Sequence, residues 1–141
     1  MTAPAPVSIA ALQTLLSEVF AASVTELNLQ VLDAQPGVVT LALPITARHV
    51  HGGGVCCGQT LMAAADTAMV LAVSSQLGGF KPMTTVQLQT SFLRPVPGDS
   101  GQARVVARVL RAGKNLVFGE IEILDAQGRL ATHSTTTYAI L

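Results

Sequence analysis

The stretch GQTLMAAADTAMVLAVSSQLGG, residues 58–79, decides the fold of this chain. Apolar and small residues run through it almost without interruption, and the two glycines that close it are typical of a helix end. The pattern predicts a long helix over about 59–77, with Gly58 at its start. Small side chains let a helix lie close to another element, and five of them occur here: Ala63, Ala64, Ala65, Ala68 and Ala72.

Shorter elements are expected on both sides of this helix. Helical spacing of apolar residues predicts a first helix that begins after Ser8, a suitable N-cap. Strands are expected at 24–34 and 38–45, with the turn AQPG between them. After the long helix the period changes to two, because Val86, Leu88, Thr90 and Phe92 alternate with Thr85, Gln87, Gln89 and Ser91. Three more strands follow, at about 101–112, 116–125 and 129–140.

This order predicts the fold class α+β, with an antiparallel sheet of about five to six strands wrapped around one long central helix. The length of 141 residues predicts a single domain over 1–141, in which 1–7 form a flexible lead. Half of the residues are hydrophobic and only 11% are charged, which is unusually apolar for a soluble monomer. The composition therefore favours an oligomer with a buried surface.

Several partners and locations are not expected. The most apolar helical part, 61–73, is shorter than the roughly 20 residues that cross a membrane, and it carries Asp66. The eight basic and eight acidic residues cancel, so no overall field favours nucleic acid. The N-terminal segment has no positive region before an apolar stretch, and the two adjacent cysteines form no disulfide framework. We therefore expect a cytoplasmic protein.

Asp66 is the only formally charged residue between Arg48 and Lys81. It lies either on an exposed strip of the long helix or in an apolar cleft, where it would suit general-base catalysis. The residues alone leave both alternatives open, although the helix has few other polar side chains that would mark an exposed strip.

Glycines precede the helix at 52–54 and at position 58. Free N–H groups at a helix start can polarise a carbonyl or hold an oxyanion, and a missing Cβ lets a ligand approach closely. The alternative is that the glycines only make a loop. No Gly-Lys-Ser/Thr follows, and no parallel βαβ unit surrounds them, so neither a P-loop nor a dinucleotide site is expected.

Three other groups of residues could carry chemistry. His49 and His51 could begin a metal site, but no glutamate lies near them in the sequence, so no metal is expected. Cys56 and Cys57 could be nucleophiles, although two small buried cysteines are the better interpretation. A basic group could bind phosphates of a ligand or simply form a solvated strand face, and it consists of Arg94, Arg104, Arg108, Arg111 and Lys114.

Taken together, three segments resemble the hotdog-fold thioesterases, in the branch similar to phenylacetyl-CoA and 4-hydroxybenzoyl-CoA thioesterases. They are GQTLMAAADTAMVLAV at 58–73, TTVQLQTSFLRPVPGD at 84–99 and GEIEILDAQGRLATHSTTTYAIL at 119–141. The resemblance covers about 8–140. The chain departs from the common family pattern at Cys57, which stands for a His, at Gln59, which stands for a Gly, and at His51, which stands for an Asn. The run GGGVCCG is more similar to a related branch with Gly-Gly-x-Val-x-Gly.

The resemblance implies an acyl-CoA thioesterase that acts on an aryl or short- or medium-chain acyl group, without a cofactor. It implies a tight homodimer, possibly a dimer of dimers, whose active sites use both chains. Asp66 would activate water or attack the thioester, the Gly58 N–H would polarise its carbonyl, and Thr85 would help to hold the water. His51 would orient the carbonyl or water in place of Asn. The expected contacts to coenzyme A are Gln59, Arg94, Arg111 and Lys114.

Two other functions remain open from the residues alone. A hotdog hydratase or dehydratase uses a His with an acid, and His51 keeps that function possible. A non-catalytic module that binds acyl-CoA would bind tightly and form no product.

Overall fold

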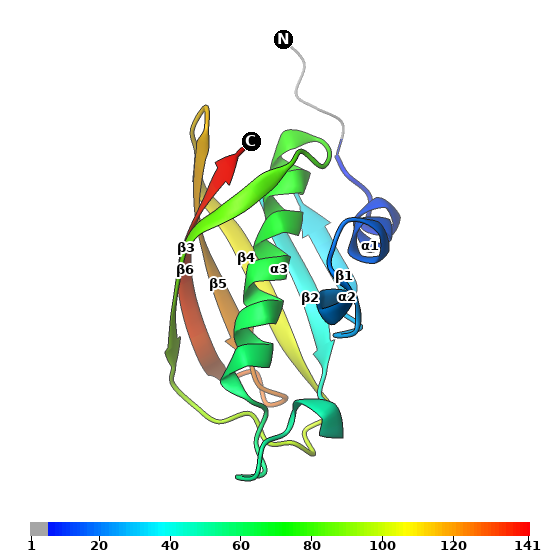
Figure 1. Ribbon diagram of the computed structural model, residues 1–141, viewed down its shortest axis with the longest axis vertical. Helices are drawn as coiled ribbons and strands as arrows, with labels where there is room; N and C mark the ends of the chain where they lie inside the picture. Colours follow the sequence, from blue (N-terminus) through cyan, green and yellow to red (C-terminus); the bar gives the residue numbers. More distant parts are fainter. Residues whose placement is uncertain (1–5) are drawn as a thin grey trace.

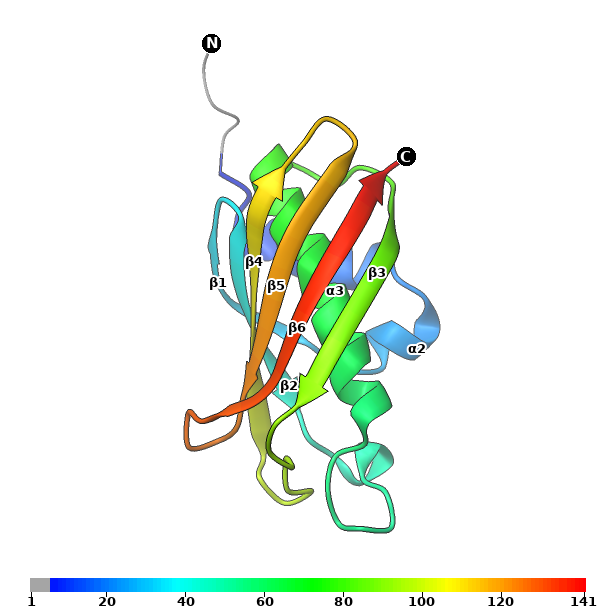
Figure 2. The same cartoon turned by 90° about the vertical axis from the view of Figure 1, so that its left-hand side faces the viewer.

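The computed structural model describes residues 6–141, and the first part of the expected flexible lead lies outside them. Six antiparallel strands form one sheet in the order β1-β2-β4-β5-β6-β3, and this sheet curves around one face of a long helix, α3 (Figures 1 and 2). The arrangement is the hotdog fold, which confirms the predicted fold class. The elements are α1 (Ile9–Glu18), α2 (Ala22–Thr25), β1 (Gln30–Gln35), β2 (Val38–Pro44), η1 (Ala47–His49), α3 (Gly58–Leu77), β3 (Met83–Phe92), β4 (Gln102–Ala112), β5 (Leu116–Leu124) and β6 (Leu130–Ile140).

The first helix begins where the sequence predicts it. The Ser8 side chain accepts a hydrogen bond from the Ala11 N–H at 3.0 Å, which satisfies one of the free donors of the first turn. Leu12 and Leu16 are buried on one face of α1, which lies beside β1 (Figure 1). The apolar spacing in the sequence therefore marks the face that packs on the fold.

The prediction of a strand over 24–34 is wrong in its first half. The chain instead forms the short helix α2, and β1 begins only at Gln30. Asn28 has a φ of +55°, a left-handed conformation that interrupts an extended chain. Leu27 and Leu29 are nevertheless buried, so their apolar character serves the core without a strand.

The long helix α3 is buried on most of its circumference. Its end is confirmed, because Gly78 has a φ of +82° and the Gly79 N–H donates to the Ser74 carbonyl at 2.9 Å. By length and composition the whole of α3 could cross a membrane, whereas the sequence analysis considered only its most apolar part, 61–73. However, 67% of its most apolar window is buried, as in the central helix of a globular fold.

Strand β3 forms one edge of the sheet and contains a bulge (Figure 2). Thr85 pairs with Tyr138 and Gln87 pairs with Thr137, so Val86 has no partner residue on β6 and forms the bulge. Val86 is 59% exposed, whereas the sequence placed it on the same face as Leu88. The bulge changes the phase of the alternation and turns Thr85 toward the helix.

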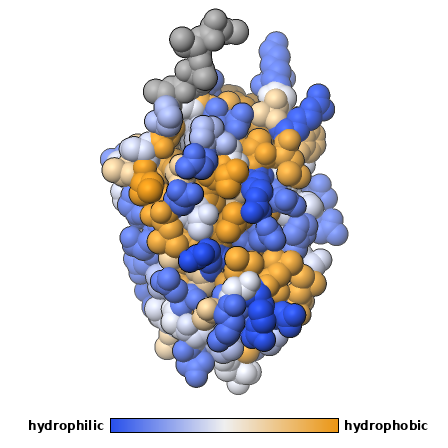
Figure 3. Space-filling view, turned by 180° about the vertical axis from the view of Figure 1, so that it is seen from behind, coloured by the Kyte–Doolittle hydropathy of each residue, from blue (hydrophilic) through white to orange (hydrophobic). Residues whose placement is uncertain are grey.

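The outer face of the sheet mixes hydrophilic residues with exposed apolar residues (Figure 3). Arg108 pairs with Glu122, and His133 pairs with Glu120, across neighbouring strands. Leu110 and Phe118 also remain exposed on β4 and β5. Arg108 therefore belongs to a partly solvated strand face. This is the second of the two interpretations that the sequence allowed for the basic group, the first being phosphate binding.

Candidate active site

Asp66 lies half-buried on the side of α3 that faces β3 and β6. The Thr85 hydroxyl donates a hydrogen bond to Asp66 Oδ1 at 2.9 Å. The Tyr138 hydroxyl is a second donor, within hydrogen-bond distance of both Asp66 Oδ1 and the Asp66 main-chain carbonyl, the latter at 2.7 Å. The structure thus brings together Asp66 and Thr85, which the sequence proposed, and adds Tyr138.

Tyr138 was missed by the sequence analysis. It is the only tyrosine of the chain, and it is 2% exposed on a strand whose other buried side chains are small. Burial, followed by the negative charge of Asp66, raises the pKa of Tyr138 above its ordinary value. The phenol therefore remains a hydrogen-bond donor at neutral pH. Its place opposite Thr85 follows from the strand register, which the sequence does not show.

A cavity of about 330 Å³ lies at the start of α3. Its walls include three predicted site residues, His51, Gly58 and Arg94, and the apolar side chain of Phe92. A Cβ on Gly58 would lie 3.2 Å from the Phe92 ring, so glycine leaves room at the point where the helix begins. Free N–H groups of the first helical turn can polarise a ligand carbonyl here.

The His51 ring is oriented by its own loop. The Gly53 N–H donates to His51 Nδ1 at 2.9 Å, so the neutral ring carries its proton on Nε2. The loop turns at Gly54, whose φ of +81° is suited to glycine. His51 is exposed and presents a donor at the rim of the cavity.

The two parts of the candidate site are separated within one chain. Gly58 and Asp66 are eight residues apart on the same helix, which corresponds to about 12 Å along its axis. One thioester carbonyl cannot touch the Gly58 N–H and the Asp66 carboxylate of the same chain. A site that uses both groups in contact with the substrate needs a second copy.

The remaining predicted contacts to coenzyme A do not gather around this cavity. Arg111 and Lys114 lie at the β4–β5 hairpin, at the end of the sheet opposite the start of α3 (Figure 2). Gln59 is exposed and lines a different groove, with His49 and Thr60. Only Arg94 of the predicted basic contacts lies beside Gly58 in the same chain.

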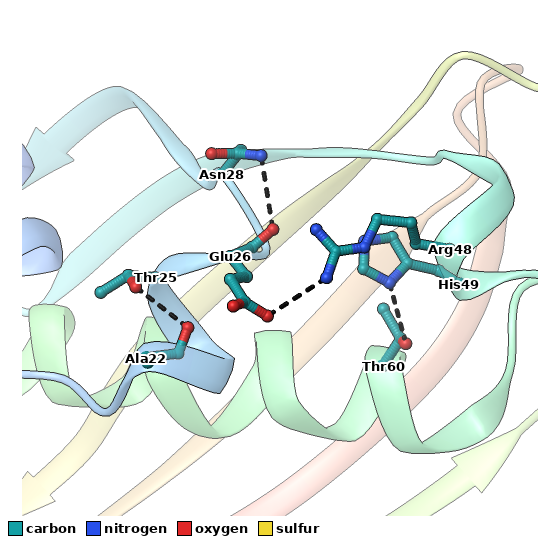
Figure 4. A network of polar contacts seen from close by, with 7 residues as sticks. All are labelled: Ala22, Thr25, Glu26, Asn28, Arg48, His49 and Thr60. Carbon is teal, nitrogen blue, oxygen red and sulfur yellow. Dashed lines mark hydrogen bonds and ion pairs between the residues drawn. The ribbon is translucent and has the colours of Figure 1, made fainter.

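His49 and His51 have different partners. His49 Nδ1 lies 3.5 Å from Thr60 Oγ1, beside the Arg48–Glu26 ion pair (Figure 4). His51 instead bonds to Gly53 and lines the cavity on the Gly58 side. Within residues 6–141, no group of three or more His, Cys, Asp and Glu side chains is arranged to hold a metal ion.

The two cysteines differ in their environments. Cys56 is 4% exposed, and burial followed by the neighbouring Cys57 raises its pKa to about 11. Cys57 is the N-cap residue of α3 and only half-buried, so the prediction of two buried cysteines is wrong for it. The hydrogen bond between Cys57 Sγ and Thr60 Oγ1, at 3.1 Å, lowers the pKa of Cys57 below its ordinary value.

We expect an alkylating reagent to modify Cys57 first, because its thiolate forms at lower pH and its sulfur is more accessible. Intact-mass measurement at pH 7.5 should show one rapid addition in wild type and none in Cys57→Ala. The matched variant Cys56→Ala should keep the rapid addition. Equal rates at both cysteines would contradict the assignment.

The comparisons with known proteins identify the family of the chain. The model of the thioesterase superfamily matches residues 48–132, which include α3, β3 and most of the candidate site. The chain belongs to the thioesterase superfamily. Membership of this family makes thioester hydrolysis the reaction class of the protein.

Among solved structures, PA5202 from Pseudomonas aeruginosa is 30% identical, with a TM-score of 0.80 over 89% of this chain and 98% of that chain. The thioesterase HI1161 from Haemophilus influenzae is 23% identical, with a TM-score of 0.85 over 100% of this chain and 95% of that chain. A thioesterase-like protein from Streptococcus pneumoniae, solved with coenzyme A, is 18% identical, with a TM-score of 0.74 over 81% of this chain and 86% of that chain.

The curated relative TV1331 from Thermoplasma volcanium is named as a proposed esterase and is 34% identical over 77 residues. The match covers 49% of this chain and 56% of that relative, so the chain matches little more than half of the relative's length.

Proposed function

We propose that the protein hydrolyses an aryl, short-chain or medium-chain acyl-CoA to the free acid and coenzyme A. The observation that carries the proposal is the Asp66 carboxylate, half-buried and held through Oδ1 by hydroxyl donors from two strands. A carboxylate held in this way is suited to act on water or on an acyl carbon. The similar protein from Streptococcus pneumoniae was solved with coenzyme A, which supports coenzyme A as the leaving group.

In the proposed reaction, the Gly58 N–H and the start of α3 polarise the thioester carbonyl. Asp66 either takes a proton from water as the water oxygen bonds to the acyl carbon, or attacks that carbon itself. The carbon–sulfur bond then breaks and the coenzyme A thiolate leaves and takes up a proton. In the second case water hydrolyses the acyl-enzyme. Thr85 holds the water near Asp66, and His51 offers its Nε2–H to the carbonyl or the water.

A homodimer would complete the site across the free edge of β3. This edge carries exposed apolar side chains at Val86, Phe92 and Leu93, and exposed strand edges tend to pair with another chain. A twofold axis near the middle of β3 would place Thr85 of one chain opposite Phe92 of its copy. Asp66 of one chain would then approach Gly58 of the other.

The same pairing would bring the scattered basic residues together. Antiparallel edges reverse the direction of the second sheet, so the end with Arg111 and Lys114 in one chain lies beside the end with Gly58 and Arg94 in the other. Arginine and lysine bind phosphates. Together with Gln59, these residues are the proposed contacts for the phosphates and pantetheine of coenzyme A.

Substitutions at Gly58 test the proposed carbonyl contact. Gly58 is the first residue of α3, where proline is well tolerated, and proline has no N–H. We expect Gly58→Pro to fold and to lose about 10²–10³-fold of thiol release from a panel of acyl-CoAs. Gly58→Ala is the matched control, because it adds the same Cβ beside Phe92 and keeps the N–H.

Mixed dimers test whether both chains form the site. In a heterodimer of Gly58→Pro and Asp66→Asn, one of the two sites keeps both wild-type groups. Equal co-refolding of these two impaired variants should therefore recover about a quarter of wild-type activity. No recovery despite heterodimer formation would contradict the shared site. Product from an enoyl-CoA by hydration, or tight binding without turnover, would instead support a hydratase or a binding module.

A further inference from the structure

Tyr138 contacts Asp66 from the strand beside β3. On β6, the side chains of Thr132, Ser134, Thr136 and Tyr138 all point inward and are buried. Of these four, Tyr138 hydrogen-bonds to the carboxylate, and its side chain is 2% exposed. Its hydroxyl lies close to two oxygens of the same residue, Asp66 Oδ1 and the Asp66 main-chain oxygen.

The two oxygens of the Asp66 carboxylate are not equivalent. Oδ1 accepts from both Thr85 and Tyr138, whereas Oδ2 has no hydrogen-bond partner within residues 6–141. Thr132 Oγ1 is the fully buried side-chain oxygen without a partner in this part of the chain, so the unpaired Oδ2 keeps some contact with solvent. A carboxylate fixed through one oxygen presents the other in a defined direction.

We propose that Tyr138 is a positioning residue of the reaction: with Thr85 it fixes Oδ1 of Asp66 and thereby leaves Oδ2 as the oxygen that acts on water or on the thioester. This assignment rests on the proposed thioester hydrolysis and deepens it. It holds whether Asp66 is the base or the nucleophile, because either role needs one oxygen aimed at the reacting atom.

The Tyr138 hydroxyl also contacts the main-chain oxygen of Asp66, which gives its proton a second acceptor. A phenol has one proton, and its neighbours here are the Asp66 carboxylate and carbonyl oxygens. While Asp66 is ionised, the proton is donated to Oδ1. When Asp66 carries a proton taken from water, the phenol can donate to the carbonyl at 2.7 Å instead. The Tyr138 hydroxyl therefore keeps a hydrogen-bond acceptor in both forms of Asp66.

The variant Tyr138→Phe removes only the hydroxyl and keeps the buried ring. We expect kcat to fall about 10- to 100-fold, the effect of losing one hydrogen bond to a charged group, with KM nearly unchanged. Thr90→Val is the matched control, because its hydroxyl bonds to Ser134 on the same two strands and does not touch Asp66. That control should keep the wild-type kcat. A folded Tyr138→Phe enzyme with wild-type kcat would overturn the assignment.

The Tyr138–Asp66 contact can also be measured without turnover. The chain has one tyrosine and no tryptophan, so its intrinsic fluorescence comes from Tyr138 alone. A phenol that donates to a carboxylate is quenched, so tyrosine emission at neutral pH should be higher in folded Asp66→Asn than in wild type. Equal emission would show that the contact is absent and would overturn the assignment. If wild type turns over no thioester, the proposed function fails, whereas an active wild type with an equally active Tyr138→Phe isolates the failure to Tyr138.

Discussion

Asp66→Asn is expected to fold and assemble as wild type does and to release thiol from acyl-CoAs about 10²–10⁴-fold more slowly. The amide has the same shape, and its oxygen can still accept from Thr85 and Tyr138. It cannot take a proton from water, however, and it is a poor nucleophile. Thiol release from a panel of aryl, short-chain and medium-chain acyl-CoAs measures the loss and ranks the acyl groups.

Asp33→Asn is the matched control for this experiment. It makes the same chemical change at an exposed position on β1, away from the candidate site, and should keep wild-type turnover. Full activity of Asp66→Asn on the best substrate would remove Asp66 from the reaction. A loss of activity together with a loss of the folded protein or of its wild-type assembly would assign Asp66 a structural role, and size-exclusion chromatography distinguishes that outcome.

Gly119→Ala is expected to have the largest effect on stability. Gly119 is buried on β5, and the side chain of Met69 on α3 lies against it. A Cβ there would overlap Met69 Cε and would lie 2.7 Å from the Arg108 main-chain oxygen. Met69 is fully buried, so its side chain has no free space to enter. We expect the free energy of unfolding to fall by about 3 kcal/mol, the upper end of typical overpacking costs.

Urea denaturation followed by circular dichroism measures this loss of stability. Gly52→Ala is the matched control, because no atom lies within 4 Å of its added Cβ. Its free energy of unfolding should remain within about 0.5 kcal/mol of wild type, as at most surface positions. Equal stability of Gly119→Ala and Gly52→Ala would show that the space between Gly119 and Met69 can accommodate a methyl group, which contradicts the prediction.

The fold could be predicted well from local patterns. The Ser8 cap, the αL glycine at 78 and the all-round apolar character of α3 are properties of neighbouring residues, and each gives a boundary or a burial state directly. The last three strands, β4 to β6, have the predicted bounds to within a residue. Around Asn28 the same patterns failed, because apolar residues of an irregular segment are buried like those of a strand.

The candidate site was predictable only in part. Asp66 stands out in the sequence because no other formal charge lies near it, and Gly58 because it begins the helix. The sequence does not reveal that His49 and His51 have different partners, or that Arg111 and Lys114 lie at the far end of the sheet from Gly58. These relations depend on how distant segments are folded together.

Local sequence thus established the central helix, the strand pattern and the acid that α3 carries, because capping, periodicity and an isolated charge are encoded within a few residues. Tertiary structure alone decided what surrounds that acid. Strand pairing sets Tyr138 opposite Thr85, and one extra residue at Val86 turns Thr85 toward α3. The rigid rise of the helix then holds Gly58 about 12 Å from Asp66. Register, bulges and distances across the fold arise from packing between remote segments, and a single sequence does not display them.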